Sequence, residues 1–574
     1  MRSRFDKDFP KVWTKLKTTL TYFSLCAAVL VFVAVPFRLS EAFTVSNIDF
    51  RLTRQAQFTS QLQTMKTDSP IAARPSVEAL ADVRKQMQQD GKSSAVVPTS
   101  VFAATVAVMV PIWFTTMLPL SLLYQSAKIV FQRIVPPKQF VPMSPFDSGH
   151  KVTASDMIPR AKRTYDIVVM GATGFVGKLT ARYMATTYGV NKDVKWAIAG
   201  RSKDKLEETK RWLAKELGMT EVMEIDCIVA DTSVPSSLPN LVRDTRVLLT
   251  TVGPFWQYGS SVVEFCAKFG THYADTTGET SWVRKMMDQW QSTAQKTGAK
   301  MISLAGHDSI PWDLSVSTVA KQLKDETGED LASVTCFNEA KAGASGGTLA
   351  TIMLQVCGPP KLGPKDDPFR MKADGTENSS PFESKIKFFP SKLINPVDQK
   401  PAFGSPFLMS FINADVVAWS HALRGGTPLS YSEVLVSPDF KTAFVSYFML
   451  MLLFTGLLNP ITKNILSKYI LPKPGEGPTM EEMEKKNFLL VSTLGTGTKG
   501  SKVESTMYFP RDAGYLDTAR MLVETGLCMA LEEERLPVQT GGFFSPGYGL
   551  GEILLNRLTK TGTYFKSGVT KNES

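Results

Sequence analysis

The stretch that decides the fold is Tyr165–Gly177, with the sequence YDIVVMGATGFVG. It opens with a short apolar run of strand-forming residues that ends abruptly at Gly171. Such a run predicts a buried parallel strand that leads directly into a turn. Gly171, Gly174 and Gly177 then recur at every third residue, where a helix is predicted to begin. This spacing is typical of a turn that lets backbone approach a pyrophosphate and packs the helix closely on its strand.

A dinucleotide is the expected ligand of this loop, because a helix N-terminus presents free N–H groups and a partial positive charge to phosphate. A glycine-rich turn without a ligand is the alternative, but the flanking strand and helix are the context that the motif requires. The candidate cofactor-binding residues of the loop are Gly171, Ala172, Thr173, Gly174, Phe175, Val176 and Gly177.

A basic residue follows the second predicted strand, Val194–Ala199. Dinucleotide-binding folds often place an acidic residue here to bind the ribose 2′-hydroxyl. This chain has Arg201 and Ser202 instead. A guanidinium suits a 2′-phosphate, so the sequence favours NADP(H) over NAD(H). The alternative is a solvated basic start of the helix predicted over Lys203–Leu217.

Two further strands are predicted over Val222–Ala230 and Arg246–Thr251. In an open parallel sheet, ligands bind at the carboxyl ends of the strands. We therefore expect Asp231 near the adenine, and Val252 and Gly253 over the nicotinamide ribose. The predicted fold is α/β, with a Rossmann-type, doubly wound parallel sheet in residues 164–320.

Five motifs occur in the order of one known family: GATGFVG, AGRSKDKL, TTVGPFWQYG, YADTTGE and GHDSIPWDL. With them the chain resembles the saccharopine dehydrogenase-like oxidoreductases, which include bacterial trans-acting enoyl reductases. The similarity continues through SGGT at 345–348, GEGPT at 475–479 and TGGFFSP at 540–546. The resemblance implies an NADP(H)-dependent enzyme with a second, mixed α/β domain, here residues 321–565.

The GHDS loop supplies the candidate catalytic residues, His307 and Asp308. The family usually has an aromatic residue where this chain has His307. An imidazole beside a nicotinamide can donate a proton, or it can simply pack against its neighbours. Asp308 and Ser309 can equally cap the helix predicted after Pro311. Glu279 and Asp313 are two other polar candidates, and each can instead have a purely structural role.

The N-terminal region is predicted to direct targeting. Residues 1–43 form a basic start and an apolar run that suit a signal peptide or a signal anchor. The junction Ser40–Phe43 resembles those of bipartite plastid presequences, so residues 44–92 are interpreted as a transit peptide or linker, with a short helix possible over Pro75–Lys92. The expected location is membrane-associated, in a plastid or at an endomembrane or lipid droplet.

Two apolar segments predict contact with a membrane. Residues 93–135 are interpreted as a transmembrane or membrane-associated helix, kinked by prolines and followed by basic residues that would face cytosol or stroma. An insertion at 442–462 is the length of a span. There, spanning would separate the halves of the enzyme, so a helix that docks on or re-enters the membrane is preferred, and a homodimer interface is the third option.

Composition excludes several classes of site. The net charge of +11 comes from lysines and arginines spread through 574 residues, without a basic block interleaved with aromatics. Nucleic acid is therefore not expected as a partner, whereas anionic lipid head groups are. Six cysteines without a CxxC pair and four scattered histidines predict neither a disulfide framework nor a metal site.

Three functions remain open from the sequence. The first is an NADPH-dependent reductase of a lipid-like C=C, C=N or C=O substrate at a membrane. The second is a reductase of an amino-acid-derived imine, which needs a cationic pocket for carboxylates. The third is a non-catalytic NADPH-binding membrane protein.

Overall fold

The computed structural model describes residues 77–94, 96–134, 142–342, 367–386, 389–466, 468 and 477–570. The predicted signal at 1–43, residues 44–76 of the predicted transit region, the SGGT segment and the first two residues of GEGPT lie outside the described residues.

The first domain is a parallel sheet, which confirms the predicted Rossmann-type fold. In the described part of the chain the sheet has seven strands in the order β14-β6-β5-β4-β1-β2-β3, and the reversal between β1 and β4 marks a doubly wound sheet. The strands are β1 (Tyr165–Met170), β2 (Trp196–Gly200), β3 (Asp226–Val229), β4 (Thr245–Thr250), β5 (His272–Asp275), β6 (Lys300–Ile302) and β14 (Gly542–Phe544).

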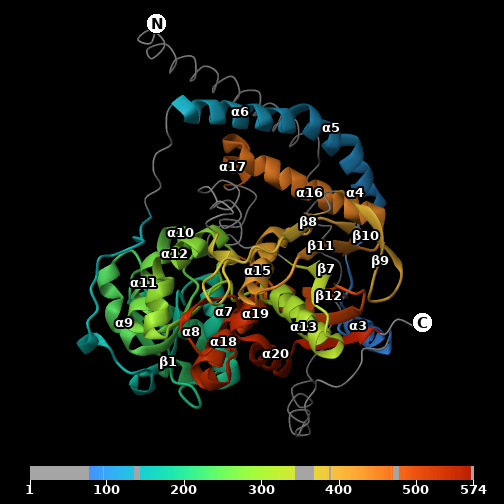
Figure 1. Cartoon of the computed structure of the whole chain (residues 1–574). Coiled ribbons are helices and arrows are strands. Elements are labelled where there is room, and N and C mark those ends of the chain that lie inside the picture. The colour runs from blue at the N-terminus through green and yellow to red at the C-terminus, as the bar shows by residue number, and fades with distance from the viewer. Residues whose placement is uncertain are drawn as a thin grey trace, which may run out of the picture.

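Helices cover both faces of this sheet (Figure 1). One face carries α7 (Phe175–Tyr188), α8 (Lys203–Leu217), α18 (Leu516–Leu531) and α20 (Gly551–Lys560). The other carries α9 (Pro239–Arg243), α11 (Ser260–Phe269) and α12 (Thr280–Thr297).

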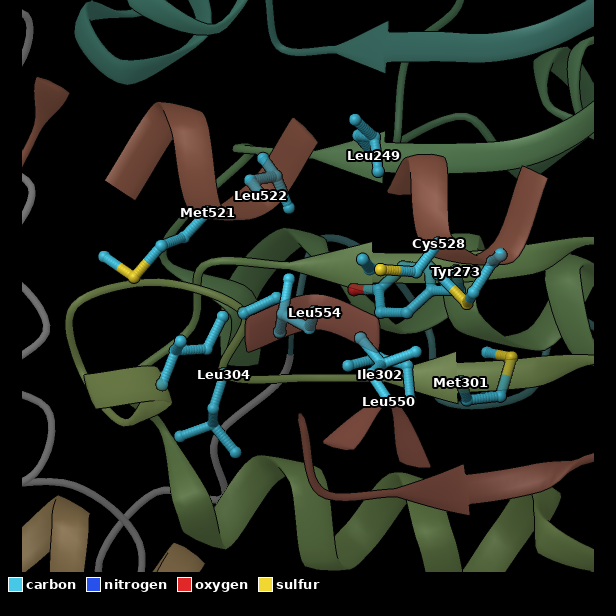
Figure 2. Close-up of a cluster of buried hydrophobic side chains, with 14 of the residues drawn as sticks. Leu249, Tyr273, Met301, Ile302, Leu304, Met521, Leu522, Cys528, Leu550 and Leu554 are labelled. Carbon is cyan, nitrogen blue, oxygen red and sulfur yellow. The ribbon is translucent and has the colours of Figure 1, made fainter. Parts of the chain in front are cut away.

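The C-terminal part of the chain completes the first domain. Figure 2 shows Leu249 of β4 and Ile302 of β6 packed against Leu522 of α18 and Leu554 of α20, and all four side chains are buried. The seventh strand, β14, pairs with β6 in parallel register, with Phe543 opposite Met301. The sequence predicted no strand there, because three residues carry too little periodicity to be recognised.

The second domain is a mixed eight-stranded sheet, as the described residues show it. Its order is β15-β13-β12-β7-β11-β10-β9, with β8 also paired to β11. Strands β12 and β13 are an antiparallel pair, in the place where the spacing of two strand-like runs around a glycine-rich turn predicts a hairpin. The strands are β7 (Leu331–Lys341), β8 (Phe382–Ile386), β9 (Ser391–Ile394), β10 (Pro401–Ser405), β11 (Leu429–Ser437), β12 (Phe488–Gly497), β13 (Lys502–Phe509) and β15 (Tyr564–Thr570).

Both faces of the second sheet are covered, because alternate residues of a strand point to opposite sides. Leu489 and Val491 of β12 join the main core, toward α13 (Ile310–Thr327) and α15 (Ser410–Leu423). Phe488 and Leu490 instead pack against α3 (Val77–Gln89), the short helix that was one alternative for this region.

Two element boundaries differ from the prediction. Residues Thr220–Glu224 form a 3₁₀ turn, so the third strand is only Asp226–Val229, a half-exposed edge strand that pairs with β2 alone. The sequence also predicts a helix that contains Tyr548–Leu558. The structure instead has two helices there, α19 (Pro546–Gly549) and α20, because Gly551 has a φ of +49° that a continuous helix does not allow.

A pair of apolar helices lies at one end of the molecule (Figure 1). The first runs without a break from Thr99 to Ile134 as α4, α5 and α6, joined by π-helical turns before Pro111 and Pro119. The second is α16 (Phe440–Leu458), which continues into α17 (Pro460–Ile465). By length and composition alone, Thr99–Lys128 and Phe440–Leu458 are long and apolar enough to cross a membrane.

Candidate cofactor site and active site

The glycine loop has the geometry that its spacing predicts. Gly171 has a φ of +88°, and a Cβ at Gly177 would lie 2.1 Å from the Gly171 carbonyl oxygen, so α7 begins against the end of β1. Gly174 is the N-cap of α7, and no side chain caps the helix. The first N–H groups of α7 are therefore available to an anion.

The other predicted cofactor residues lie at the same edge of the sheet, because β1 to β4 are parallel neighbours. A Cβ on Gly200, at the end of β2, would lie 3.8 Å from the Thr173 methyl group. Arg201 is exposed beside it, and Ser202 caps α8 by accepting a hydrogen bond from the Lys205 N–H.

Two loops complete this edge. The Asp231 carboxylate accepts a bond from the Ser233 N–H at 2.9 Å, which orders the turn after β3. Val252 and Gly253 follow β4 and reach the glycine loop, since a Cβ at Gly171 would lie 2.8 Å from the Val252 side chain. Every predicted cofactor residue thus lies in the first turn of α7 or in a loop that follows one of these four strands.

The ring of Phe175 packs against Gly477 of the second domain and against Tyr515, which precedes α18. A Cβ on Gly477 would lie 2.6 Å from that ring, and the Tyr515 ring meets it edge-on at 5.4 Å. Of Phe175, the backbone N–H therefore remains as the group that can face a cofactor. Sequence reasoning missed Gly477 as a neighbour of the loop, although it is part of the GEGPT motif.

A buried carboxylate holds the loop that follows β6. Asp275, at the end of β5, accepts bonds from the Ser303 hydroxyl at 2.9 Å and the Leu304 N–H at 3.1 Å. Burial raises the pKa of Asp275 to about 6. Leu304 has a φ of +60°, a conformation that side chains rarely adopt, so this network fixes a strained backbone just before the GHDS loop. Sequence analysis did not single out Asp275.

His307 is held in place and uncharged at neutral pH. Its backbone N–H donates to the Thr518 hydroxyl at 3.0 Å, and its ring meets the Trp312 ring edge-on at 5.2 Å. Burial lowers the pKa of His307 to about 4. The side chain is therefore an imidazole and not an imidazolium near pH 7.

Asp308 has the opposite shift. Its carboxylate lies 4.0 Å from His307 Nδ1, and its side chain remains 27% exposed. Burial raises the pKa of Asp308 to about 7, so the carboxyl exists in both its protonated and its ionised form near neutral pH. The capping alternative is wrong, because α13 has no side-chain cap and the Ser309 hydroxyl donates to the Asp308 carbonyl.

The remaining polar candidates have structural partners. Glu279 accepts bonds from the N–H groups of Phe255 at 2.8 Å and Trp256 at 2.7 Å, which caps a short helix. Asp313 accepts a bond from the Gly547 N–H at 2.6 Å and so joins α13 to α19. Among the residues the structure describes, no group of three or more His, Cys, Asp or Glu can hold a metal ion.

The fold and this site define an NADP-binding oxidoreductase. The profile of the saccharopine dehydrogenase NADP binding domain matches residues 167–302. A trans-acting enoyl reductase of Mycobacterium leprae is 31% identical over 419 residues, covering 70% of this chain and 97% of the relative. A Mycobacterium tuberculosis protein named as a putative trans-acting enoyl reductase is 32% identical over 417 residues, covering 70% of this chain and 96% of the relative.

The chain therefore belongs to the saccharopine dehydrogenase-like oxidoreductases, the family that includes the trans-acting enoyl reductases. Among solved structures, the saccharopine dehydrogenase (L-Glu forming) of Saccharomyces cerevisiae is similar at 14% identity and a TM-score of 0.40, covering 71% of this chain and 99% of that one. The expected family, fold class and NADP(H) cofactor are confirmed.

Proposed function

We propose that this enzyme uses NADPH to reduce a lipid-like C=C, C=N or C=O substrate at a membrane surface. One observation favours a lipid-like substrate. A continuous series of apolar contacts connects the GHDS loop with the apolar helix α16. The His307 ring packs on Trp312, and Trp312 lies 5.4 Å from Phe407. The next residue, Leu408, packs against Leu457 of α16.

The cofactor would be held by the four loops at the carboxyl edge of the first sheet. The glycine loop binds the pyrophosphate through the first N–H groups of α7. Arg201 pairs with the 2′-phosphate, Asp231 lies by the adenine, and Val252 and Gly253 lie against the nicotinamide ribose. When bound, NADPH supplies a hydride.

In this proposal the enzyme's own residues supply the proton and the enclosure. The Asp308 carboxyl, whose raised pKa keeps its protonated form populated near pH 7, donates a proton to the substrate atom next to the one that accepts hydride. Neutral His307 lies beside that carboxyl and adds no positive charge that would lower the pKa of Asp308.

The two other functions predict different surroundings. An imine reductase for several carboxylates needs cations beside the reacting group. Burial alone, with no neighbouring cation among the described residues, sets the pKa of Asp308. A non-catalytic NADPH-binding protein would bind the cofactor equally well but would not consume it with any substrate.

The test begins with the full chain in mild detergent, titrated with NADPH and NADH by nicotinamide fluorescence. Arg201→Ala should weaken NADPH binding at least tenfold with little effect on NADH, and Gly174→Asp should abolish both. Lys215→Ala, which removes a charge from the last turn of α8, is the matched control. Absence of NADPH binding by the folded protein would overturn the proposed site.

The substrate class is then tested by NADPH consumption. Acyl chains that carry an enoyl, imine or carbonyl group should be reduced faster than short water-soluble analogues. Preference for a carboxylate-rich imine would favour the second function. Tight NADPH binding without consumption of any of these substrates would favour the third.

A further inference from the structure

We propose that the helix pair α4–α6 and α16 lies in the plane of one leaflet of a lipid bilayer, without crossing it. This inference rests on the proposed membrane association and adds its topology. It makes the protein a monotopic enzyme, with both domains on the same side of the membrane.

Three polar side chains of the first helix bond to the second helix. Trp113 Nε1 donates to the Thr455 hydroxyl at 3.0 Å, and the Ser121 hydroxyl donates to the Thr455 carbonyl at 3.1 Å. The Gln125 amide donates to the Leu458 carbonyl at 2.7 Å. Hydrogen bonds of this kind join helices in an apolar environment.

The outward face is apolar and uncharged. Leu122 is 59% exposed and Phe114 is 57% exposed, with Leu123, Val106 and Val108 exposed beside them. No charged residue occurs from Ser93 to Ala127. A helix on the surface of a soluble domain turns its polar residues outward, and this pair has the reverse pattern. The face therefore fits the interior of a lipid leaflet.

The segments before and after the first helix both pack on the same folded part of the protein. Before it, α3 packs on the second sheet. After it, the Ser144 N–H donates to the Gln257 carbonyl at 2.9 Å, in the first domain. The two domains share one core, so the chain leaves and re-enters on the same side.

The second helix has the same arrangement. β11 precedes α16 in the second sheet, and Gly477, which follows it, lies against Phe175 of the first domain. A single crossing would place these two flanks on opposite sides of the membrane. A single crossing is therefore excluded for both helices by the position of their flanking segments, as the sequence already indicated for residues 442–462.

The relative direction of the two helices also indicates that neither of them crosses the bilayer. The Val97 N–H donates to the Thr442 hydroxyl at 3.0 Å at the start of the pair, and Gln125 meets Leu458 at its end, so the helices are parallel. Two parallel crossings need a return crossing between them in the chain. Among the described residues, only these two helices are long and apolar enough to cross.

Cations lie at both ends of the pair. The Lys441 ammonium donates to the Thr99 hydroxyl at 3.3 Å at the start. At the other end Lys128 closes the apolar run, and Lys463 and Lys468 follow α16. Lysines at these places can bury their stems in the leaflet and bring their charges to anionic head groups. A lipid surface is therefore favoured over a second copy of the chain.

Docking is tested by flotation of the full chain with phosphatidylcholine vesicles, with and without phosphatidylserine. The wild type should float, more completely with phosphatidylserine, and a double variant with Leu122→Glu and Leu123→Glu should not. Leu531→Glu, an exposed leucine at the end of α18, is the control and should float. A wild type that does not float but dimerises through this face would overturn the proposal.

Topology is tested with single added cysteines in vesicle-bound protein. Lys85→Cys and Lys151→Cys lie on exposed sites before and after the first helix. A membrane-impermeant maleimide should label both without detergent, above the background of the unsubstituted protein. Protection of either position until detergent is added would overturn the in-plane arrangement. NADPH binding by the same samples keeps this result separate from the proposed reductase function.

Discussion

Gly477 lies directly on the ring of Phe175, so closely that a Cβ at Gly477 would be 2.6 Å from that ring. Phe175 is the first residue of α7, and Gly477 comes from the segment after the apolar helix α17. The second domain therefore closes directly over the start of α7, where the glycine loop leads into the helix.

Gly477→Ala should push the ring of Phe175 out of position and weaken NADPH binding by about tenfold, because overpacking of this kind costs on the order of 1–3 kcal/mol. Gly514→Ala is the control, since its Cβ would meet Asp512 at an ordinary 3.4 Å. Titration with NADPH measures both. Equal affinity for the two variants would show that the contact does not shape the loop.

Two substitutions within the glycine loop should differ in their effect on stability. Gly177→Ala places a Cβ 2.1 Å from the Gly171 carbonyl oxygen, so we expect a loss of roughly 3 kcal/mol or more in the free energy of unfolding. At Gly174 the same oxygen would be 3.3 Å away. Gly174→Ala should therefore fold normally. Urea unfolding of both variants checks the contrast, which disappears if α7 can shift away from β1.

Reduction should depend on the protonated form of Asp308. The pKa of this carboxyl is raised to about 7 by burial, so turnover should fall as the pH rises above 7. Asp308→Asn should lower kcat by about 10²-fold or more and remove that pH dependence. Ser309→Ala, which leaves the carboxyl intact, is the control. A profile unchanged in Asp308→Asn would remove Asp308 from the chemistry.

The same pKa gives a stability prediction. Between the ordinary value of 3.8 and about 7, folded Asp308 binds more protons than the unfolded chain, so its contribution to stability falls as the pH rises through this range. Asp308→Asn should therefore unfold at a higher temperature than the wild type at pH 8. The difference should shrink toward pH 4, and calorimetry at both pH values checks the sign.

Helix α3 should be required for a stable second domain. Arg84 donates to Glu339 at 2.9 Å, and that carboxylate also accepts bonds from Ser94 and Asn395. Arg84→Met removes the positive partner of a largely buried carboxylate, so we expect a loss of about 3 kcal/mol. Lys85→Met, at the exposed neighbouring position, should change stability by less than about 0.5 kcal/mol in urea unfolding.

The packing of α3 on the second domain also limits where the predicted transit peptide can be cleaved. If a transit peptide is removed within residues 44–92, the cut has to fall before Val77 for the enzyme to keep α3. N-terminal sequencing of the mature protein would show this directly.

How far the sequence could predict the structure depends on how local each feature is. The helix Lys203–Leu217 was predicted to the residue, because its apolar periodicity ends at recognisable boundaries. The contact of Gly477 with Phe175 joins positions that only the folded chain brings together, and no local pattern marks it. Asp308 and Ser309 precede a helical proline, yet the buried loop turns both side chains away from capping.

Completion of the first sheet by β14 has a consequence for synthesis on the ribosome. When residues 142–342 have emerged, β6 still lacks its neighbour, and Leu249 and Ile302 lack the helices that cover them in Figure 2. The nascent first domain must therefore wait, with apolar surface uncovered, until about 220 more residues, up to the end of α20 at Lys560, have been translated, which is on the order of 10 s or more at typical rates. During that interval the apolar helix at Thr99–Lys128 is already outside the ribosome, so the proposed attachment to a membrane can precede the assembly of a complete cofactor domain.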